Sequence, residues 1–228
     1  MLDFRRFEAL TFDCYGTLID WESGLLEAFS LALSGSYDRD DLLRRFATHE
    51  TRLEAGPYLS YQGVLAKTLR AIAQELEEEP SEAQVAAFAQ SVKEWRPFAD
   101  SPAALAQLGA RFRLGVITNC DDDLFAASNT RLGVTFDWVI TAQQVRSYKP
   151  ADANFLAAFE RLAIPRERIL HVAQSLFHDH VPAKRLGLQT VWIDRRAGRQ
   201  GIGATPPAGA IPDAVFPDLA SFAAAALA

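Results

Sequence analysis

Asp13 is the first residue of this chain whose type and position suggest chemistry. It follows the apolar run 9–12 and stands three residues before Gly16. A carboxylate in that position can attack a substrate carbon or phosphorus, and the N–H groups of a glycine turn can hold an anion beside it. A strand-end Asp also commonly caps the turn that follows it, and position alone does not separate the two roles. Asp13 is therefore a candidate nucleophile.

Two further polar groups stand after other apolar runs. Thr118 and Asn119 follow the run 114–117, and they converge on Asp13 if the two runs form neighbouring strands. The same pair can instead cap the helix that we expect to begin near Asp122. Lys149 stands in a loop after a third run, where its ammonium would keep Asp13 ionised and attract an anionic substrate.

A fourth cluster, Gln174, Ser175 and Asp179, follows the apolar run 169–173. The triplet 178–180, His-Asp-His, contains metal-ligand types, but three contiguous side chains rarely face one ion, and no further His or Cys has ligand spacing. We expect no metal site. Asp179 is predicted to cap a helix and to bond Lys149.

The apolar runs predict buried parallel strands, because each is continuous rather than alternating. Helical patterns lie between them, at 102–110, 122–132, 154–162 and 179–186. Strands are expected at 9–12, 114–117, 138–140, 169–173, 190–193 and 214–216. This alternation predicts an α/β fold with a doubly wound parallel sheet, whose ligand site lies beyond the carboxyl ends of the central strands.

One interval, from about residue 20 to about residue 97, contains no convincing strand. It reads as four amphipathic helices, with breaks near 34–37, 56–61 and 79–81 where Gly, Pro and Ser interrupt the periodicity. We therefore expect an inserted helical module. The segment 198–212 is rich in Gly, Pro and Ala and is predicted to be a surface loop that could cover something.

Composition excludes several functional classes. The 228 residues are 49% hydrophobic and 23% charged, which is typical of a globular protein. The formal net charge is −6 and no Lys/Arg block is present, so we expect neither nucleic acid nor a membrane as partner. Two cysteines, Cys14 and Cys120, are too few for a disulfide framework, and residues 1–8 lack the pattern of a signal peptide. These features favour a cytoplasmic protein.

Four motifs occur in an order and spacing that resemble the haloacid dehalogenase superfamily: the segment 12–18, Thr118-Asn119, Lys149-Pro150, and the segment 175–179. The resemblance covers nearly the whole chain. It implies a Rossmann-like catalytic core at 1–20 and 98–228, with an inserted α-helical cap domain at 21–97. It also suggests a homodimer.

The resemblance narrows the expected reaction. Phosphatases of the superfamily carry an acidic proton donor two residues after the nucleophile and a metal-binding Asp in the fourth motif, whereas this chain has Tyr15 and Gln174 there. Loss of the acid removes the proton donor for an alcohol, and a neutral amide weakens a hard-cation site. Halide needs neither. The chain thus looks like an L-2-haloacid dehalogenase that acts on short 2-haloalkanoic acids, without a cofactor, through an aspartyl ester.

Roles carried over from the resemblance make Asp13 the nucleophile, oriented by Thr17 and balanced by Lys149. Thr118 and Asn119 would bind the substrate carboxylate. Spacing after the nucleophile assigns the halide-binding Arg of the cap to Arg45, which falls on or beside the apolar stripe of its predicted helix; Arg44 and Arg52 are the alternatives.

Other residues complete the expected site. Tyr15, Gln174, Ser175, Phe177 and His178 are predicted to line the substrate site. The residue that activates water for ester hydrolysis is left open among Asp179, Gln174 and His178. Phe155 stands where the comparable dehalogenases commonly have Tyr. Two alternatives remain: a magnesium-dependent phosphatase of small phosphoesters, and a non-catalytic relative that binds a small anion or a protein partner.

Overall fold

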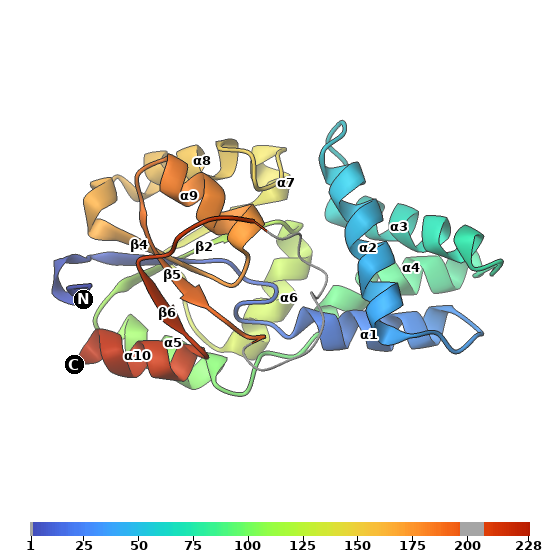
Figure 1. Ribbon diagram of the computed structural model, residues 1–228, viewed down its shortest axis with the longest axis horizontal. Coiled ribbons are helices and arrows are strands. Elements are labelled where there is room, and N and C mark those ends of the chain that lie inside the picture. Colours follow the sequence, from blue (N-terminus) through green and yellow to red (C-terminus); the bar gives the residue numbers. More distant parts are fainter. Residues whose placement is uncertain (1, 197–207) are drawn as a thin grey trace.

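The computed structural model describes residues 2–196 and 208–228, and its centre is a six-stranded parallel sheet (Figure 1). The strands lie in the order β3-β2-β1-β4-β5-β6. Their bounds are β1 Ala9–Phe12, β2 Arg113–Thr118, β3 Trp138–Thr141, β4 Ile169–Ala173, β5 Gln189–Ile193 and β6 Ala214–Phe216. The predicted Rossmann-like sheet and the positions of its strands are confirmed. Of the predicted loop 198–212, residues 198–207 lie outside the described residues.

Helices cover both faces of the sheet, which explains why its strands are continuously apolar (Figure 1). One face packs against α8 and α9, and the other against α5, α6 and α10. The helices of this part are α5 Ser101–Gly109, α6 Asp122–Leu132, α7 Ala142–Val145, α8 Ala153–Leu162, α9 Val181–Arg185 and α10 Leu219–Leu227, with short 3₁₀ turns η1 Phe4–Arg6 and η3 Arg166–Arg168.

The strand order reverses at β1, because β2 and β3 lie on one side of it and β4 to β6 on the other. Register pairs Phe12 with both Val116 and Val172, so the carboxyl ends of β1, β2 and β4 lie side by side. Such a switch point is where doubly wound sheets bind ligands. It brings Asp13, the pair Thr118–Asn119 and the segment 174–179 to one edge of the sheet.

The interval between β1 and α5 contains four helices, as its periodicity predicts. They are α1 Trp21–Ala32, α2 Arg39–Glu54, α3 Tyr61–Glu75 and α4 Glu82–Gln90, followed by the 3₁₀ turn η2 Ser91–Glu94. The N-caps of all four helices accept a backbone N–H: Asp20, Asp38, Ser60 and Ser81. These helices stand beside the carboxyl edge of the sheet (Figure 1).

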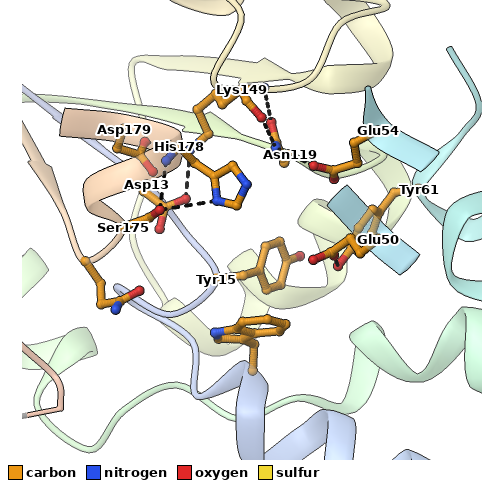
Figure 2. Close-up of a pocket in the computed structure, with 12 residues that line it drawn as sticks. Asp13, Tyr15, Glu50, Glu54, Tyr61, Asn119, Lys149, Ser175, His178 and Asp179 are labelled. Carbon is orange, nitrogen blue, oxygen red and sulfur yellow. Dashed lines mark hydrogen bonds and ion pairs between the residues drawn. The ribbon is translucent and has the colours of Figure 1, made fainter. Parts of the chain in front are cut away.

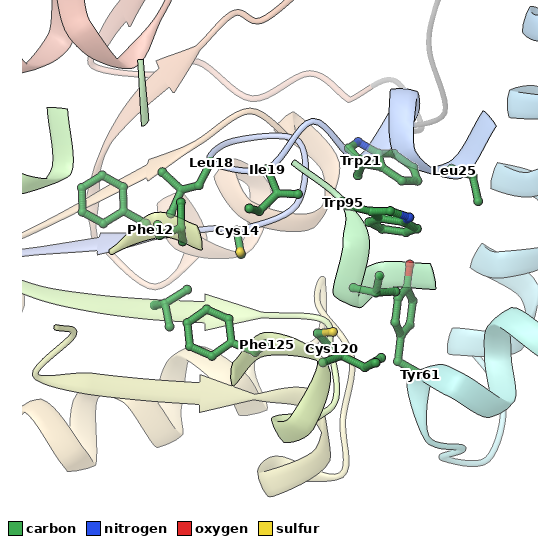
Figure 3. Close-up of a cluster of buried hydrophobic side chains, with 14 of the residues drawn as sticks. Phe12, Cys14, Leu18, Ile19, Trp21, Leu25, Tyr61, Trp95, Cys120 and Phe125 are labelled. Carbon is green, nitrogen blue, oxygen red and sulfur yellow. The ribbon is translucent and has the colours of Figure 1, made fainter. Parts of the chain in front are cut away.

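A continuous apolar cluster joins the four helices to the sheet (Figure 3). Trp95 lies at the junction, with its ring edge-on to Tyr15 at a centroid distance of 5.8 Å. A methyl group on Gly24 of α1 would lie 2.3 Å from this indole, so only glycine allows the contact. Because this cluster packs the helices directly on the core, their inner surface can form one wall of a site.

The segment after β4 differs from the prediction. The sequence pattern predicts one helix over 179–186, whereas the structure has a π-helical turn, η4 Leu176–His180, before α9. Pro182 explains where α9 begins, since it lacks the N–H that would continue an earlier helix and fits only the first turn of a new one. The turn also places His178 and Asp179 beside Ser175, near the end of β4.

Candidate active site

Asp13 lies at the floor of a cavity between the sheet edge and the four helices (Figure 2). Its Oδ2 accepts a hydrogen bond from Thr17 Oγ1 at 2.6 Å, and its Oδ1 accepts one from Lys149 Nζ at 2.9 Å. The turn that carries these groups depends on Gly16, whose φ of +93° is unfavourable for other residues. Thr17 Oγ1 also accepts from the backbone N–H of Gln174, which ties the turn to β4.

Lys149 joins two buried carboxylates. Its Nζ donates to Asp13 Oδ1, to Asp179 Oδ1 at 2.7 Å and to the carbonyl of Ile117 at 2.9 Å, and its side chain is 1% exposed. His171 lies at 3.0 Å from the same Asp179 oxygen through Nε2. Lysine's three protons thus all have acceptors, which fixes the ammonium in one place.

Burial and charge act in opposite directions on these groups. Burial raises the pKa of Asp13 above its ordinary value, and the Lys149 ammonium and the Thr17 hydroxyl oppose that rise. For Asp179, burial would raise the pKa, but Lys149 and His171 together lower it, so this carboxylate is ionised. For Lys149, burial would lower the pKa, and the two carboxylates outweigh it and raise the pKa. Lys149 is therefore a permanent cation.

Asn119, Ser175 and His178 form the polar rim of the cavity. Asn119 is held by the backbone of Lys149, since its Oδ1 accepts from Lys149 N at 2.7 Å and its Nδ2 donates to Lys149 O at 3.0 Å. Ser175 Oγ accepts from His178 N and lies 3.2 Å from His178 Nδ1. Burial lowers the pKa of His178 to about 4, so its imidazole is neutral at pH 7.

Tyr15 and Gln174 flank Asp13 in the positions predicted from the sequence. The Tyr15 hydroxyl lies 3.0 Å from Ser128 Oγ and accepts from Cys120 Sγ, and burial raises its pKa well above the ordinary value. It is a weak acid in this setting. The backbone carbonyl of Gln174 accepts from Trp192 Nε1 at 2.8 Å, which fixes the start of the fourth motif against β5.

The wall opposite Asp13 carries two carboxyls that the sequence reasoning missed (Figure 2). Glu50 and Glu54 project from α2, and Tyr61 from α3 donates its hydroxyl to Glu50 Oε1 at 2.8 Å. Glu54 Oε2 accepts from Asn119 Nδ2 at 3.3 Å. A signal for them exists: Leu42, Phe46, Glu50 and Glu54 recur every four residues, so the apolar face of the helix continues into these carboxyls.

The prediction that Arg45 lies in the site is wrong in position. Its Nε donates to Asp41 Oδ2 at 2.7 Å and its Nη1 to Glu75 Oε2 at 2.6 Å, on a side of α2 away from the cavity. Two carboxylate partners satisfy this guanidinium without any bound anion. The alternatives, Arg44 and Arg52, also lie outside the lining of the cavity.

Thr118 and Phe177 also differ in position from the prediction. Asn119 faces the cavity, and successive side chains at a strand end point in opposite directions, so Thr118 points away. Its hydroxyl is buried without a partner among the described residues. Phe177 lies in the η4 turn and lines a neighbouring cavity instead.

This second cavity, of about 330 Å³, adjoins the first, which measures about 60 Å³. Glu54, Lys149 and His178 line both. Its walls are aromatic: Tyr58 stacks on Tyr148 at a centroid distance of 5.6 Å, and Arg146 lies 5.0 Å from the Tyr58 ring. The small cavity holds a few water-sized groups, and the larger one extends it.

The side chains beside Asp13 do not fit Mg²⁺, the cation used by phosphatases of the superfamily that this chain resembles. Both Asp13 oxygens and one Asp179 oxygen accept hydrogen bonds from Thr17 or Lys149, and Gln174 adds a neutral amide. Residues 2–196 and 208–228 contain no group of three or more His, Cys, Asp or Glu side chains that could hold a metal ion. The remaining Asp179 Oδ2 is buried without a hydrogen-bond partner in this part of the chain and is a single acceptor.

Within residues 2–196 and 208–228, no helix is long and apolar enough to cross a membrane.

Comparisons with known proteins agree with this geometry. The chain is 28% identical over 209 residues to (S)-2-haloacid dehalogenase H-109 of Pseudomonas putida, with 89% of this chain and 92% of that protein covered. It is 33% identical over 207 residues to 5-amino-6-(5-phospho-D-ribitylamino)uracil phosphatase YigB of Escherichia coli, with 82% and 84% covered. The solved L-2-haloacid dehalogenase of Xanthobacter autotrophicus with chloropropionic acid covalently bound has the same fold, with a TM-score of 0.80, 22% identity and coverage of 96% and 97%.

A family model also matches most of the chain. The match to haloacid dehalogenase-like hydrolases spans residues 7–177, which includes Asp13, Asn119, Lys149 and the beginning of the η4 turn. The sheet topology and the carboxylate at the end of β1 fit the same assignment. The chain is therefore a hydrolase and belongs to the haloacid dehalogenase-like hydrolase family.

Proposed function

We propose that this hydrolase releases halide from short 2-haloalkanoic acids through an ester on Asp13, without a metal ion. The observation that carries the proposal is the position of Asp13 between Thr17 and Lys149. Tyr15 and Gln174 lie beside Asp13, at the two positions where metal-dependent phosphatases of the haloacid dehalogenase superfamily have carboxylates. The similarity to (S)-2-haloacid dehalogenases supports it.

The first step is a displacement at carbon. An Asp13 oxygen attacks C2 of the acid, the new C–O bond forms as the carbon–halogen bond breaks, and the halide leaves with the bonding electron pair. Thr17 and Lys149 hold the carboxylate in place at the floor of the cavity. The small size of the cavity supports this step, since a short acid bound there has little room away from Asp13.

The second step is hydrolysis of the ester. Water adds to Cγ of Asp13, and the bond from Cγ to the ester oxygen breaks. That oxygen, which came from Asp13, leaves as the hydroxyl of a 2-hydroxy acid, and a proton is released. We assign the orientation of this water to the free oxygen of Asp179, which is an acceptor without a protein partner in the described chain. Water never touches C2, so the configuration at C2 inverts once.

Substrate binding follows from the charge of the cavity. Asn119, Ser175 and His178 offer polar contacts to a carboxylate, and Lys149 supplies the positive charge. Protonation of Glu50 and Glu54 favours the entry of an anion beside them, and burial raises the pKa of both carboxyls above the ordinary value. We propose that α1–α4, residues 21–97, act as the cap of the site on a core of residues 1–20 and 98–228. The two free thiols, Cys14 and Cys120, favour action in the reducing cytoplasm.

The experiment is halide release from L- and D-2-chloropropionate with EDTA present, for the wild type and the Asp13→Asn variant. We expect halide from the wild type with one enantiomer preferred, and none from the variant. A single turnover in ¹⁸O-labelled water should label Asp13 and leave the first product unlabelled. Label in that first product would contradict the ester.

A magnesium-dependent phosphatase is the second candidate, and the 33% identity to YigB favours it. The donor set around Asp13 argues against it, since it offers Mg²⁺ no free pair of carboxylates. Phosphate release from a generic phosphoester that requires added magnesium, with no halide release, would replace the first proposal by this one.

A further inference from the structure

Glu50 and Glu54 form the part of the cavity that the proposed reaction steps leave unused. Both lie on the inner face of α2, one helical turn apart, and Figure 2 shows them across the cavity from Asp13. Glu50 is 8% exposed and has the Tyr61 hydroxyl as its partner. Among the described residues, neither carboxyl forms an ion pair with a cation.

The direction of the displacement brings the departing group to this wall. Attack at carbon proceeds in line, so the leaving group moves away from Asp13 along the continuation of the new bond. Asp13 forms the floor and α2 forms the facing wall of a cavity of only about 60 Å³. A cavity of that size holds a few water-sized groups, so a group that departs from a carbon bound at Asp13 contacts α2.

The pair is also held in the protonated form. Burial raises the pKa of Glu50 to about 7, with the Tyr61 hydrogen bond acting weakly against it. Burial raises the pKa of Glu54 well above its ordinary value, and the adjacent Glu50 raises it further. Lys149 and the hydrogen bond from Asn119 oppose these effects on Glu54 without outweighing them, and two carboxyls one turn apart repel each other when both are ionised. One of them therefore keeps its proton near pH 7.

We propose that a protonated carboxyl of the Glu50–Glu54 pair donates a hydrogen bond to the departing group, a role that Tyr15 and the displaced Arg45 do not fill. The inference rests on the proposed function and extends it to basic leaving groups. The protonated carboxyl donates a hydrogen bond to the halide as the carbon–halogen bond breaks. Fluoride accepts hydrogen bonds more strongly than the other halides, so the contact stabilises its departure most. The proton stays on the carboxyl, because HF is a stronger acid than a carboxyl with a pKa of about 7. With chloride or bromide, which are hardly basic, the hydrogen bond is weak.

The test compares two leaving groups on one carbon skeleton. Release of fluoride from 2-fluoropropionate and of bromide from 2-bromopropionate is measured for the wild type, Glu50→Gln, Glu54→Gln and the double variant. Glu75→Gln, a carboxyl-to-amide change on α3 outside the cavity, is the matched control. The ratio of the two kcat/KM values within one variant cancels differences in folded fraction, and the amide introduced by Glu50→Gln can still accept from Tyr61.

We expect the fluoride rate of the double variant to fall by about 100-fold or more, the size of a lost hydrogen-bond donor to a developing anion, and the bromide rate by less than about tenfold. The control should change neither. Equal losses for both halides would show that the pair only shapes the cavity and would overturn the inference. Bromide release without any fluoride release by the wild type would overturn it as well.

Failure of the proposed function looks different. If the wild type releases neither halide, the dehalogenase proposal is wrong, and the hydrogen-bond-donor role is tested on 4-nitrophenyl and methyl phosphate. Methoxide is more basic than 4-nitrophenolate, just as fluoride is more basic than bromide. A selective loss of methanol release in the double variant would support the inference, and an equal loss would overturn it.

Discussion

Lys149 sets the charge balance of the site, because it is the one cation between two buried carboxylates within the described site. Without it, Asp13 and Asp179 would repel each other in a region that excludes water. Removal of one partner from a buried ion pair is costly, since the other charge is left without compensation. The position of this ammonium therefore matters for stability, and under the proposed function it also matters for catalysis.

Lys149→Met is expected to lower the free energy of unfolding by about 3–5 kcal/mol and to reduce kcat by more than about 100-fold. Lys184→Met, at a partly exposed pair with Asp213, is the control and should cost less than about 1 kcal/mol. Chemical denaturation and halide release measure the two effects. Addition of Asp179→Asn should recover stability but not turnover, and recovery of turnover would show that Lys149 has no role in the reaction.

Glu50 gives a stability prediction at the same scale. Burial raises its pKa from 4.5 to about 7, so the unfolded chain ionises this carboxyl at lower pH than the folded chain does. Its contribution to stability is therefore present below the unfolded pKa and is lost as pH rises through about 7. Glu50→Gln removes this titration and keeps the Tyr61 acceptor.

We expect Glu50→Gln to gain stability relative to the wild type between about pH 5 and about pH 8, on the order of 2 kcal/mol. The groups that face Glu50 are Glu54 on α2, Tyr61 on α3, Tyr15 after β1, and the Lys149 and Asp13 ion pair across the cavity. Urea denaturation at both pH values measures the difference. A difference that does not change with pH would contradict a buried carboxyl with a raised pKa.

At the scale of elements, Asp121 fastens α3 to the core. This residue precedes α6, and its two carboxylate oxygens accept from the backbone N–H groups of Tyr61 and Gln62 at 2.9 and 3.0 Å. The Tyr148 hydroxyl donates to Leu59 O nearby. A carboxylate at a helix N-terminus satisfies free N–H groups and interacts favourably with the helix dipole. Here it also joins two parts of the fold that form opposite walls of the cavity.

Asp121→Ala should speed hydrogen exchange at Tyr61 and Gln62 by about tenfold, the equivalent of one lost helix cap. It should also raise KM, because the wall that carries Tyr61 is less firmly placed. Ser81→Ala removes the cap of α4, away from the cavity, and should leave KM unchanged. Unchanged exchange at Tyr61 in Asp121→Ala would show that packing alone holds the helix.

At the scale of the whole molecule, two adjoining cavities set the size of substrate that fits. The smaller one contains Asp13, and the larger one, of about 330 Å³, has the aromatic walls of Tyr58 and Tyr148. An acid with a longer side chain can place C2 at Asp13 and its alkyl tail in the larger cavity. Burial of each additional methylene there is favourable.

Ala151→Trp, which fills part of the larger cavity, should lower kcat/KM for 2-bromohexanoate by about tenfold or more and leave 2-bromopropionate within about twofold. Halide release from the two acids by the same variant measures the ratio, and the short acid is the internal control. An equal effect on both acids would mean that the tail does not use this cavity.

The sequence by itself determined the local features of this protein. Continuous apolar runs predict the strands, because a strand buried on both faces has no polar position, and the four-helix interval follows from its periodicity and its breaks. Asp13, Thr17 and Lys149 could be named because each stands in a short motif near a strand end, and the topology of a doubly wound sheet brings those ends together.

Only the tertiary structure decided which side chains form the opposite wall. The rotation of α2 against the core turns Glu50 and Glu54 inward and leaves Arg45 paired with Asp41 and Glu75. A sequence pattern gives the face of a helix to within about one residue, which is the difference between Arg45 and Phe46. The rotation itself depends on contacts of α2 with other helices, such as Phe46 against Trp21 and Phe29 of α1 and Glu50 against Tyr61 of α3. The local pattern narrows the inner face of α2 to a few residues, and packing decides which of their charges line the cavity.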